Sequence, residues 1–322
     1  MPLGLLAPGF AQGWLLAGAL QLALAALAFA LVRRRSGRWW LEAGALPPPT
    51  WRLRYTAILL ALHLVLAVPA AATFAALSLA EGLVDRSGGF VAFGRDGMQV
   101  VERRYRAAGD EVVLVGMVHV GEPSLYRDLY ASFVEERTVV LQEGVTGLDD
   151  LLGVPLSYEP IAAAAGLAMQ PPIEALMPEL QAGRPDGAEE WPHLRHADLD
   201  ASEFSPQTLA LLERLARLIR APDPWAELAG FGDFARSAGP ALWRDVEEDL
   251  VVRRNRHVIV ELDRALEDYA RVVIPWGALH MPGIEHGVLS RGFEPVGERR
   301  RLAVRYATLA NGLRLLLRAL AR

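Results

Sequence analysis

Two histidines and one glutamate each follow a short apolar run, and these side chains are the best candidates for chemistry. His119 ends a Gly-Met-Val-His sequence, His280 ends Gly-Ala-Leu-His, and Glu143 comes after the run between them. The runs are short and β-branched, which predicts buried strands. Because the carboxyl ends of parallel strands share one edge, where ligands bind, the three side chains should face one another there. The three runs are 112–115, 138–141 and 271–276.

The Gly-x-x-His spacing occurs twice, and the repeat has a physical interpretation. Glycine lets the backbone turn sharply and leaves space beside it, while each histidine projects over the sheet edge. Two neutral imidazoles and a carboxylate suit a divalent metal ion with open coordination positions. We therefore predict His119, Glu143 and His280 as ligands of a divalent cation, with Mn, Co or Zn as candidates. The alternative is two strand-end histidines bonded only to the backbone.

Three polar residues end a further expected strand near residue 195. Asp198 could complete the metal shell or hold a ligand histidine in place. An exposed turn is the alternative, and His196 and Asp200 stay open in the same way. The chain has no His-Glu-x-x-His sequence, so it is not a zincin.

Arg254 and Asn255 lie on a long helical pattern, 241–269, beside two further arginines. One interpretation is a solvated basic face. The other is a clamp for an oxyanion or carboxylate, which suits the planar fork of arginine. On the second interpretation Arg254 and Asn255 are catalytic, together with Glu143 as general base or metal ligand.

The elements around these residues predict an α/β fold with a mixed sheet and flanking helices. Strands alternate with helical patterns, and the first pair of strands reads as a hairpin. Expected strands are 90–93, 98–105, 112–115, 138–141, 194–200, 271–276 and 292–296; expected helices are 123–136, 160–168, 206–220, 241–269, 281–289 and, in the arginine-rich and leucine-rich tail, 300–322. We assign 83–300 to the α/β domain and 301–322 to a basic amphipathic helix.

These motifs resemble the TraB/PrgY, GumN and TIKI family. The resemblance rests on VLVGMVHVGEPSLY, VVLQEGV, VVRRNRHVIVELDRAL and VVIPWGALHMPGI. It covers roughly 90–296 and is patchy from 147 to 245. The family pairs two Gly-x-x-His motifs with a glutamate and an Arg-Asn pair. Matched residue by residue, the motif positions are His119, Glu143, Arg254, Asn255 and His280; GMVH departs mildly from the usual first motif.

The resemblance implies a TraB-domain metalloprotease, that is, a membrane-tethered, divalent-metal-dependent hydrolase acting on peptides outside the cell. The family also contains proteins that restrain peptide pheromones, so a non-catalytic protein that binds or sequesters peptides is an alternative. Erythromycin-esterase and haem-binding ChaN-like proteins look similar in outline, which keeps a membrane-bound esterase as a third hypothesis.

Two uncharged apolar runs precede this domain and predict a two-helix transmembrane hairpin over 1–82. The runs 14–32 and 56–80 each approach the roughly 20 residues that a membrane span needs. Between them lie six arginines and one glutamate, six minus one giving +5, which predicts a cytoplasmic loop. We expect a multi-pass protein of the bacterial cytoplasmic membrane, with its C-terminal domain extracytoplasmic.

Composition limits the chemistry further. The 322 residues carry a net charge of −5 and no cysteine, so neither thiolate ligands nor disulfides contribute. The mild acidity gives no reason to expect a nucleic acid partner. Expected partners are a peptide or small ester substrate and membrane lipid, and the sequence leaves the oligomeric state open.

Overall fold

The computed structural model describes residues 53–153, 157–182, 192–221 and 224–311, with seven isolated positions between 23 and 37. The chain divides into two compact units, Met1–Leu83 and Val84–Arg322. The second unit holds every candidate site residue.

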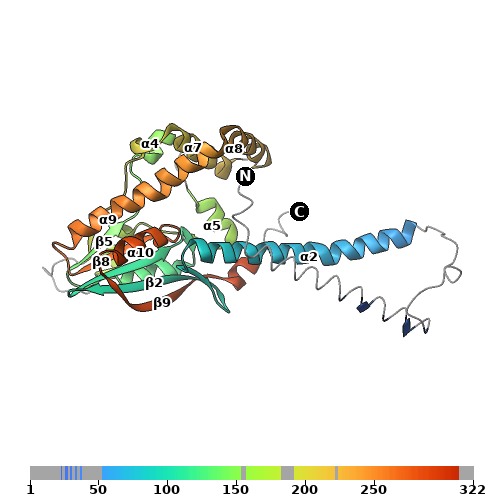
Figure 1. The fold of residues 1–322 in the computed structure, drawn as a ribbon, viewed down its shortest axis with the longest axis horizontal. Helices are drawn as coiled ribbons and strands as arrows, with labels where there is room; N and C mark the ends of the chain where they lie inside the picture. The colour runs from blue at the N-terminus through green and yellow to red at the C-terminus, as the bar shows by residue number, and fades with distance from the viewer. Residues whose placement is uncertain are drawn as a thin grey trace. The chain divides into compact units, whose positions relative to one another are not determined.

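Within the described residues, seven strands form one mixed sheet (Figure 1). The order of paired strands is β1-β2-β3-β8-β5-β7, and β9 also pairs with β2. The four strands β3, β8, β5 and β7 pair in parallel, whereas β1, β2 and β9 are antiparallel to their neighbours. Their bounds are β1 Val91–Phe93, β2 Gly97–Ala107, β3 Asp110–Met117, β5 Thr138–Gln142, β7 His193–His196, β8 Arg271–Gly277 and β9 Glu294–Arg305.

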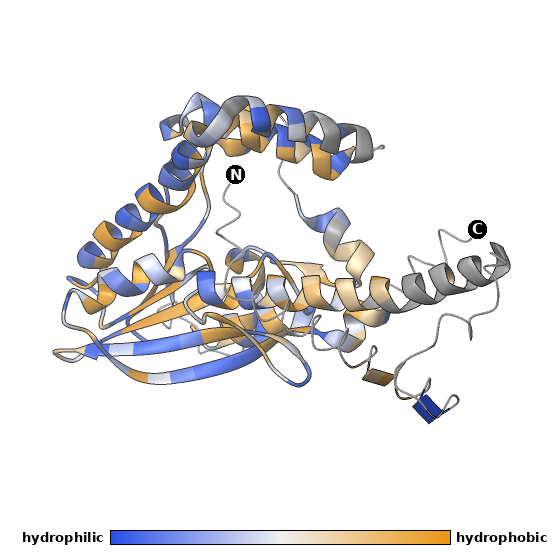
Figure 2. Cartoon of the chain, turned by 45° about the vertical axis from the view of Figure 1, so that its right-hand side comes forward, coloured by the Kyte–Doolittle hydropathy of each residue, from blue (hydrophilic) through white to orange (hydrophobic). Residues whose placement is uncertain are grey.

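The α/β class with a mixed sheet and flanking helices is confirmed. The two strands that enclose the first crossover, β3 and β5, are not direct neighbours, because β8 enters from much later in the chain and pairs with both. The central strands are fully apolar where they are covered on two faces, as in parallel sheets generally. Figure 2 shows apolar colour gathered in these strands and polar colour along the β2–β9 ribbon.

Helices cover both faces of the sheet. Glu285 of α10 (Met281–Leu289) ion pairs with Arg103 of β2. Glu102 points to the opposite face, since side chains alternate along a strand. There it pairs with Arg301, which also bonds Ser132 at the end of α3 (Pro123–Ala131). The sheet therefore lies between a layer with α10 and a layer with α3.

The remaining helices extend from these layers. The long helical pattern is confirmed as α8, η4 and α9, where η4 is a π-helical turn; Figure 1 shows α4, α7 and α8 beyond the end of α9, away from the sheet. Bounds are α4 Leu148–Leu152, α5 Glu159–Ala165, α6 Ile173–Leu180, α7 Pro206–Arg220, α8 Pro224–Glu247, η4 Glu248–Arg253 and α9 Arg254–Ala265; a small second sheet joins β4 Val120–Gly121 to β6 Ala168–Met169.

The C-terminal prediction is wrong in its boundary. The expected last strand, 292–296, is instead the long β9, which continues to Arg305. Its arginines pair along β2, with Arg301 opposite Val100 and Arg300 opposite Val101. Arg300, Arg301 and Arg305, which were part of the predicted helix, are therefore strand residues. Helix follows over 306–311, and 312–322 lies outside the described residues.

The N-terminal unit holds most of α2, Leu53–Arg86, which includes the run 56–80. Most of the run 14–32 lies outside the described residues. Across the part of the chain that is described, no helix meets the length and hydropathy that a membrane crossing requires.

Candidate functional site

The structure places the predicted side chains at one edge of the sheet, after neighbouring parallel strands. His119 follows β3, His280 follows β8, and Glu143 comes directly after β5. Asp198 lies two residues beyond the end of β7. Because these four strands pair in parallel in the order β3-β8-β5-β7, their carboxyl ends bring the four side chains to the same side.

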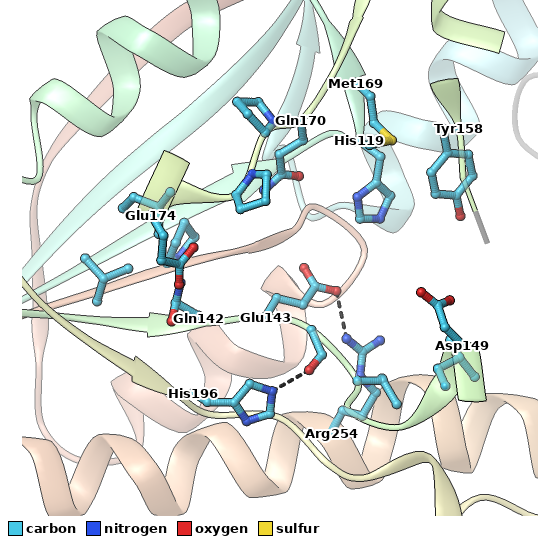
Figure 3. A pocket seen from close by; sticks show the side chains of 18 of the residues that line it. His119, Gln142, Glu143, Asp149, Tyr158, Met169, Gln170, Glu174, His196 and Arg254 are labelled. Carbon is cyan, nitrogen blue, oxygen red and sulfur yellow. Dashed lines mark hydrogen bonds and ion pairs between the residues drawn. The ribbon is translucent and has the colours of Figure 1, made fainter. Parts of the chain in front are cut away.

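Arg254, at the start of α9, bonds three members of this group, and Figure 3 shows its ion pair with Glu143. Its Nε and Nη2 donate to the two oxygens of Asp198, at 2.9 and 2.6 Å. Nη2 also donates to Glu143 Oε1 at 2.9 Å. Nη1 donates to His280 Nε2 at 3.1 Å and to the carbonyl of Leu250 at 3.2 Å. One buried guanidinium thus joins two carboxylates and an imidazole.

Asp198 is the anchor of Arg254. Its side chain is fully buried, and besides the guanidinium it accepts bonds from the backbone N–H groups of Gly144 and Leu199. Burial alone would raise the pKa of Asp198, but the bonds from Arg254 and these two N–H groups hold that pKa below its usual value. The sequence left three roles open for Asp198, as a metal ligand, as the holder of a ligand histidine, or in an exposed turn. In the structure Asp198 is buried, and both of its oxygens bond Arg254 rather than a histidine.

The protonation of His280 follows from its hydrogen bonds. The amide nitrogen of Asn255 donates to the carbonyl of His280 at 3.2 Å, so its amide oxygen faces His280 Nδ1, 2.7 Å away. That oxygen can only accept, which assigns the proton to Nδ1 and leaves the lone pair on Nε2. The lone pair points at Arg254 and Glu143. A Cβ at Gly283 would lie 2.4 Å from the Asn255 amide nitrogen, so glycine there leaves the amide its place.

Burial keeps His280 neutral. The side chain is 9% exposed, and desolvation lowers its pKa from 6.5 to about 4, although Glu143 acts in the opposite direction. Trp276 packs beneath the site, with its ring 5.3 Å from His280 and 5.3 Å from the guanidinium of Arg254. The indole N–H donates to the carbonyl of Leu141, which fixes this apolar floor.

Lowering the pH should therefore destabilise the fold through His280. The unfolded chain binds the proton with a pKa near 6.5 and the folded chain only near 4, so stability is full above about pH 6.5 and falls as the pH drops towards 4. The free energy of unfolding should be lower by about 2 kcal/mol at about pH 5 than above pH 6.5. Urea unfolding in chelator, compared between wild type and His280→Gln, measures it. Equal pH dependence in both proteins would contradict the assignment.

Glu143 is held from two sides. Oε1 accepts from Arg254 and lies 3.6 Å from His280 Nε2, while Oε2 accepts from the backbone N–H of Gly277. A Cβ at Gly277 would lie 3.4 Å from the Glu143 carboxylate. Neither Gly116 nor Gly277 has a positive φ. At Gly116 a Cβ would lie 2.8 Å from the Phe90 side chain, so glycine supplies space there, whereas at Gly277 a Cβ would make only ordinary van der Waals contact.

A π-helical turn immediately precedes Arg254. Residues Glu248–Arg253 form η4 between two α-helical segments, and π-turns are frequent at functional sites. Arg254 and Asn255 follow this turn directly, as the first two residues of α9. Asp249 within this turn accepts from the backbone N–H of Ser205 and pairs with Arg253, so the turn is tied to the neighbouring helix α7.

A cavity of about 660 Å³ opens over Glu143 and Arg254 (Figure 3). His119 is exposed in its wall and stacks on Tyr158, with ring centroids 5.1 Å apart. His196 forms another part of the wall and contacts the carbonyl of Gly144. The other ionisable side chains in the lining are Asp149, Asp150 and Glu174.

Sequence reasoning missed Tyr158 and the acidic lining of this cavity. Tyr158 lies just before α5, in the stretch where the family resemblance is patchy, and no spacing links it to His119. Its pKa is raised by burial and by the nearby Glu143. Asp200 lies outside the cavity lining and instead bonds Thr146 and Ser202.

His280 and Glu143 together suit a divalent cation. His280 offers a neutral Nε2, and Glu143 Oε1 lies 3.6 Å from it, a separation that two ligands of one metal ion can have when each is about 2 Å from it. His119 faces the same cavity but stacks on Tyr158. Among the described residues, no three His, Asp or Glu side chains are already grouped to hold a metal ion.

Comparisons with known proteins add no relative: no family model, curated protein or solved structure matches the chain.

Proposed function

We propose that this protein is a hydrolase that cleaves peptide bonds, with a divalent cation as cofactor and its active site at the carboxyl edge of β3, β8, β5 and β7. The observation that carries the proposal is the contact of neutral His280 and Glu143 with Arg254, together with the cavity that Glu143 and Arg254 line. Hydrolysis of a carbonyl compound needs a group that accepts a proton from water and a fixed positive charge beside the carbonyl oxygen. Glu143 can be the first and Arg254 the second. The TraB-like motifs support the same class.

Glu143 is the general base of this proposal. Water attacks the carbonyl carbon of the substrate, and its proton moves to the Glu143 carboxylate, which delivers it to the leaving nitrogen as the carbon–nitrogen bond breaks. The backbone N–H of Gly277 and the guanidinium of Arg254 hold that carboxylate in one orientation. An imposed orientation contributes to rate because the reacting groups need not be ordered during the reaction.

Arg254 stabilises negative charge on the carbonyl oxygen as it develops. Its fork to Asp198 holds the guanidinium at two atoms, and a donor that is already oriented in a water-poor site is worth more than one in bulk solvent. Asn255 supports the site differently, since both ends of its amide are engaged by His280. Its proposed task is to keep the Nε2 lone pair directed inward.

The cation would be held by His280 and Glu143, with His119 as third ligand. When bound, it would supply Lewis acidity that polarises a carbonyl oxygen. The local charge favours a cation: Glu143 and Asp198 give −2, Arg254 gives +1 and His280 is neutral, which sums to −1.

Two membrane spans with an extracytoplasmic catalytic domain complete the proposal. The support is the +5 loop between the two apolar runs. Alkaline phosphatase fused after Arg322 should be active, because it would fold outside the cytoplasm, and the same fusion after Arg38 should be inactive. Colony and membrane-fraction phosphatase activity measures this, with fusion levels checked by immunoblot. The reverse pattern would place the domain in the cytoplasm.

Product formation tests the hydrolase. The purified full-length chain, reloaded separately with Mn, Co or Zn, should cleave members of a diverse peptide panel, and chelator should abolish the cleavage. Cleavage of simple esters alone would favour an esterase. Peptide binding without product from either class would favour the sequestering protein.

A further inference from the structure

The guanidinium of Arg254 and a metal ion need the same atoms. Arg254 Nη1 lies 3.1 Å from His280 Nε2, and Nη2 lies 2.9 Å from Glu143 Oε1. These are the two donor atoms that a divalent cation would bind. The arginine is therefore more than a neighbour of the proposed metal position, because it already bonds both ligands.

We propose that Arg254 and a divalent cation are alternative occupants of this site, and that binding of the cation requires Nη1 to leave His280. The inference rests on the proposed metal position but not on turnover. It assigns Arg254 a second task, which is to set how tightly the cation is held.

Arg254 and the cation compete for one atom, His280 Nε2. An imidazole nitrogen without a proton has a single in-plane lone pair, and His280 Nε2 gives it to Arg254 in this structure. It cannot accept this bond and ligate a metal at once. Glu143 differs, because a carboxylate oxygen has more than one lone pair and could keep a bond to Nη2 while it binds a cation. Coulomb repulsion between the guanidinium and the cation acts in the same direction.

The arginine can release His280 without becoming unpaired. Its Nε and Nη2 form a fork with Asp198, whose side chain has no exposed surface. Nη1 also donates to the carbonyl of Leu250. Because the guanidinium is rigid, Nη1 leaves His280 only when the whole group tilts on its fork to Asp198. This tilt exchanges one bond to His280 for the cation. In the proposed reaction, it also frees an N–H donor for the substrate oxygen.

Metal affinity without substrate tests the exclusion. The purified full-length chain is stripped with chelator, and Mn²⁺ and Zn²⁺ are titrated into it by calorimetry. Arg254→Ala removes the competing bond, and so does Arg254→Lys, whose ammonium can pair with Asp198 but lacks the fork that reaches His280 as well. Both variants should bind the cation about tenfold more tightly or better, because a hydrogen bond from a charged donor has to be broken only in the wild type.

Arg253→Ala is the matched control, since Arg253 is the preceding residue, at the end of the π-turn η4, and bonds Glu203 and Asp249 instead. Its affinity should equal that of the wild type. Adding His280→Ala to Arg254→Lys should remove the gain. Circular dichroism checks folding, and Arg254→Lys decides the test if Arg254→Ala does not fold.

For the wild type itself, nitrogen-15 NMR of His280 should show Nε2 changing its environment on metal addition while Nδ1 keeps its proton. Equal or weaker affinity in both arginine variants, or no binding by any of the proteins, would overturn the inference. Turnover with unchanged affinities would overturn this inference alone, whereas the expected order of affinities without any turnover would overturn only the hydrolase.

Discussion

Replacing Asp198 by alanine should cost the fold about 3–5 kcal/mol of unfolding free energy, the usual loss when one partner of a buried ion pair is removed. The carboxylate is fully buried and receives the guanidinium of Arg254 at two atoms. Its loss also leaves the backbone N–H groups of Gly144 and Leu199 without their acceptor. Urea unfolding of the purified chain, followed by circular dichroism, measures the change.

Asp200→Ala is the control for this prediction. Asp200 lies two residues further along and also bonds neighbouring groups, but it is exposed, so its loss should be much smaller. A loss of similar size in both variants would mean that the Asp198–Arg254 pair has no special place in the stability of the site.

Glu143→Gln should reduce turnover by about 10²–10⁴-fold, the usual contribution of a general base, with the fold intact. The amide has nearly the shape of the carboxylate but takes no proton, and one of its two ends can no longer accept from Arg254 or Gly277. Metal affinity should also fall, so part of the lost activity should return at high metal concentration. Steady-state kinetics over a metal series measures both effects.

Glu174→Gln provides a matched change in the same cavity. Glu174 lines the cavity and bonds Gln142 rather than the arginine, so its variant should keep most of the activity. Equal losses in the two variants would indicate that the charge of the cavity matters and that Glu143 has no chemical role of its own.

The strands and their polar ends were predictable because they depend on local patterns. Apolar runs followed by glycine identified β3, β5 and β8, and the rule that parallel strands share a carboxyl edge located His119, Glu143 and His280. The neighbours of these strands were not predictable in the same way. The pairing of β8 with both β3 and β5 is a long-range choice that no local pattern encodes.

The sequence also could not predict that Arg254 bonds three of the other site residues. A run of arginines on a helix fits a solvated face as well as a site, and only the tertiary contacts show that Arg254 is buried at the site whereas Arg256 is exposed. The prediction of a helix in the C-terminal tail was wrong for a related reason. Arginines alternating with apolar residues suit a helix by composition, but opposite β2 they find Glu102 and the end of α3 as partners, and β9 forms instead.

The most direct test of the central claim is cleavage in water enriched in the heavy oxygen isotope. The metal-loaded wild-type chain is incubated with the peptide panel, and the products are read by mass spectrometry. Hydrolysis at this site predicts that each newly formed carboxyl group gains one heavy oxygen atom, and that Glu143→Gln forms little of this product. Peptides that remain bound but intact, with no heavy oxygen incorporated, would contradict the account.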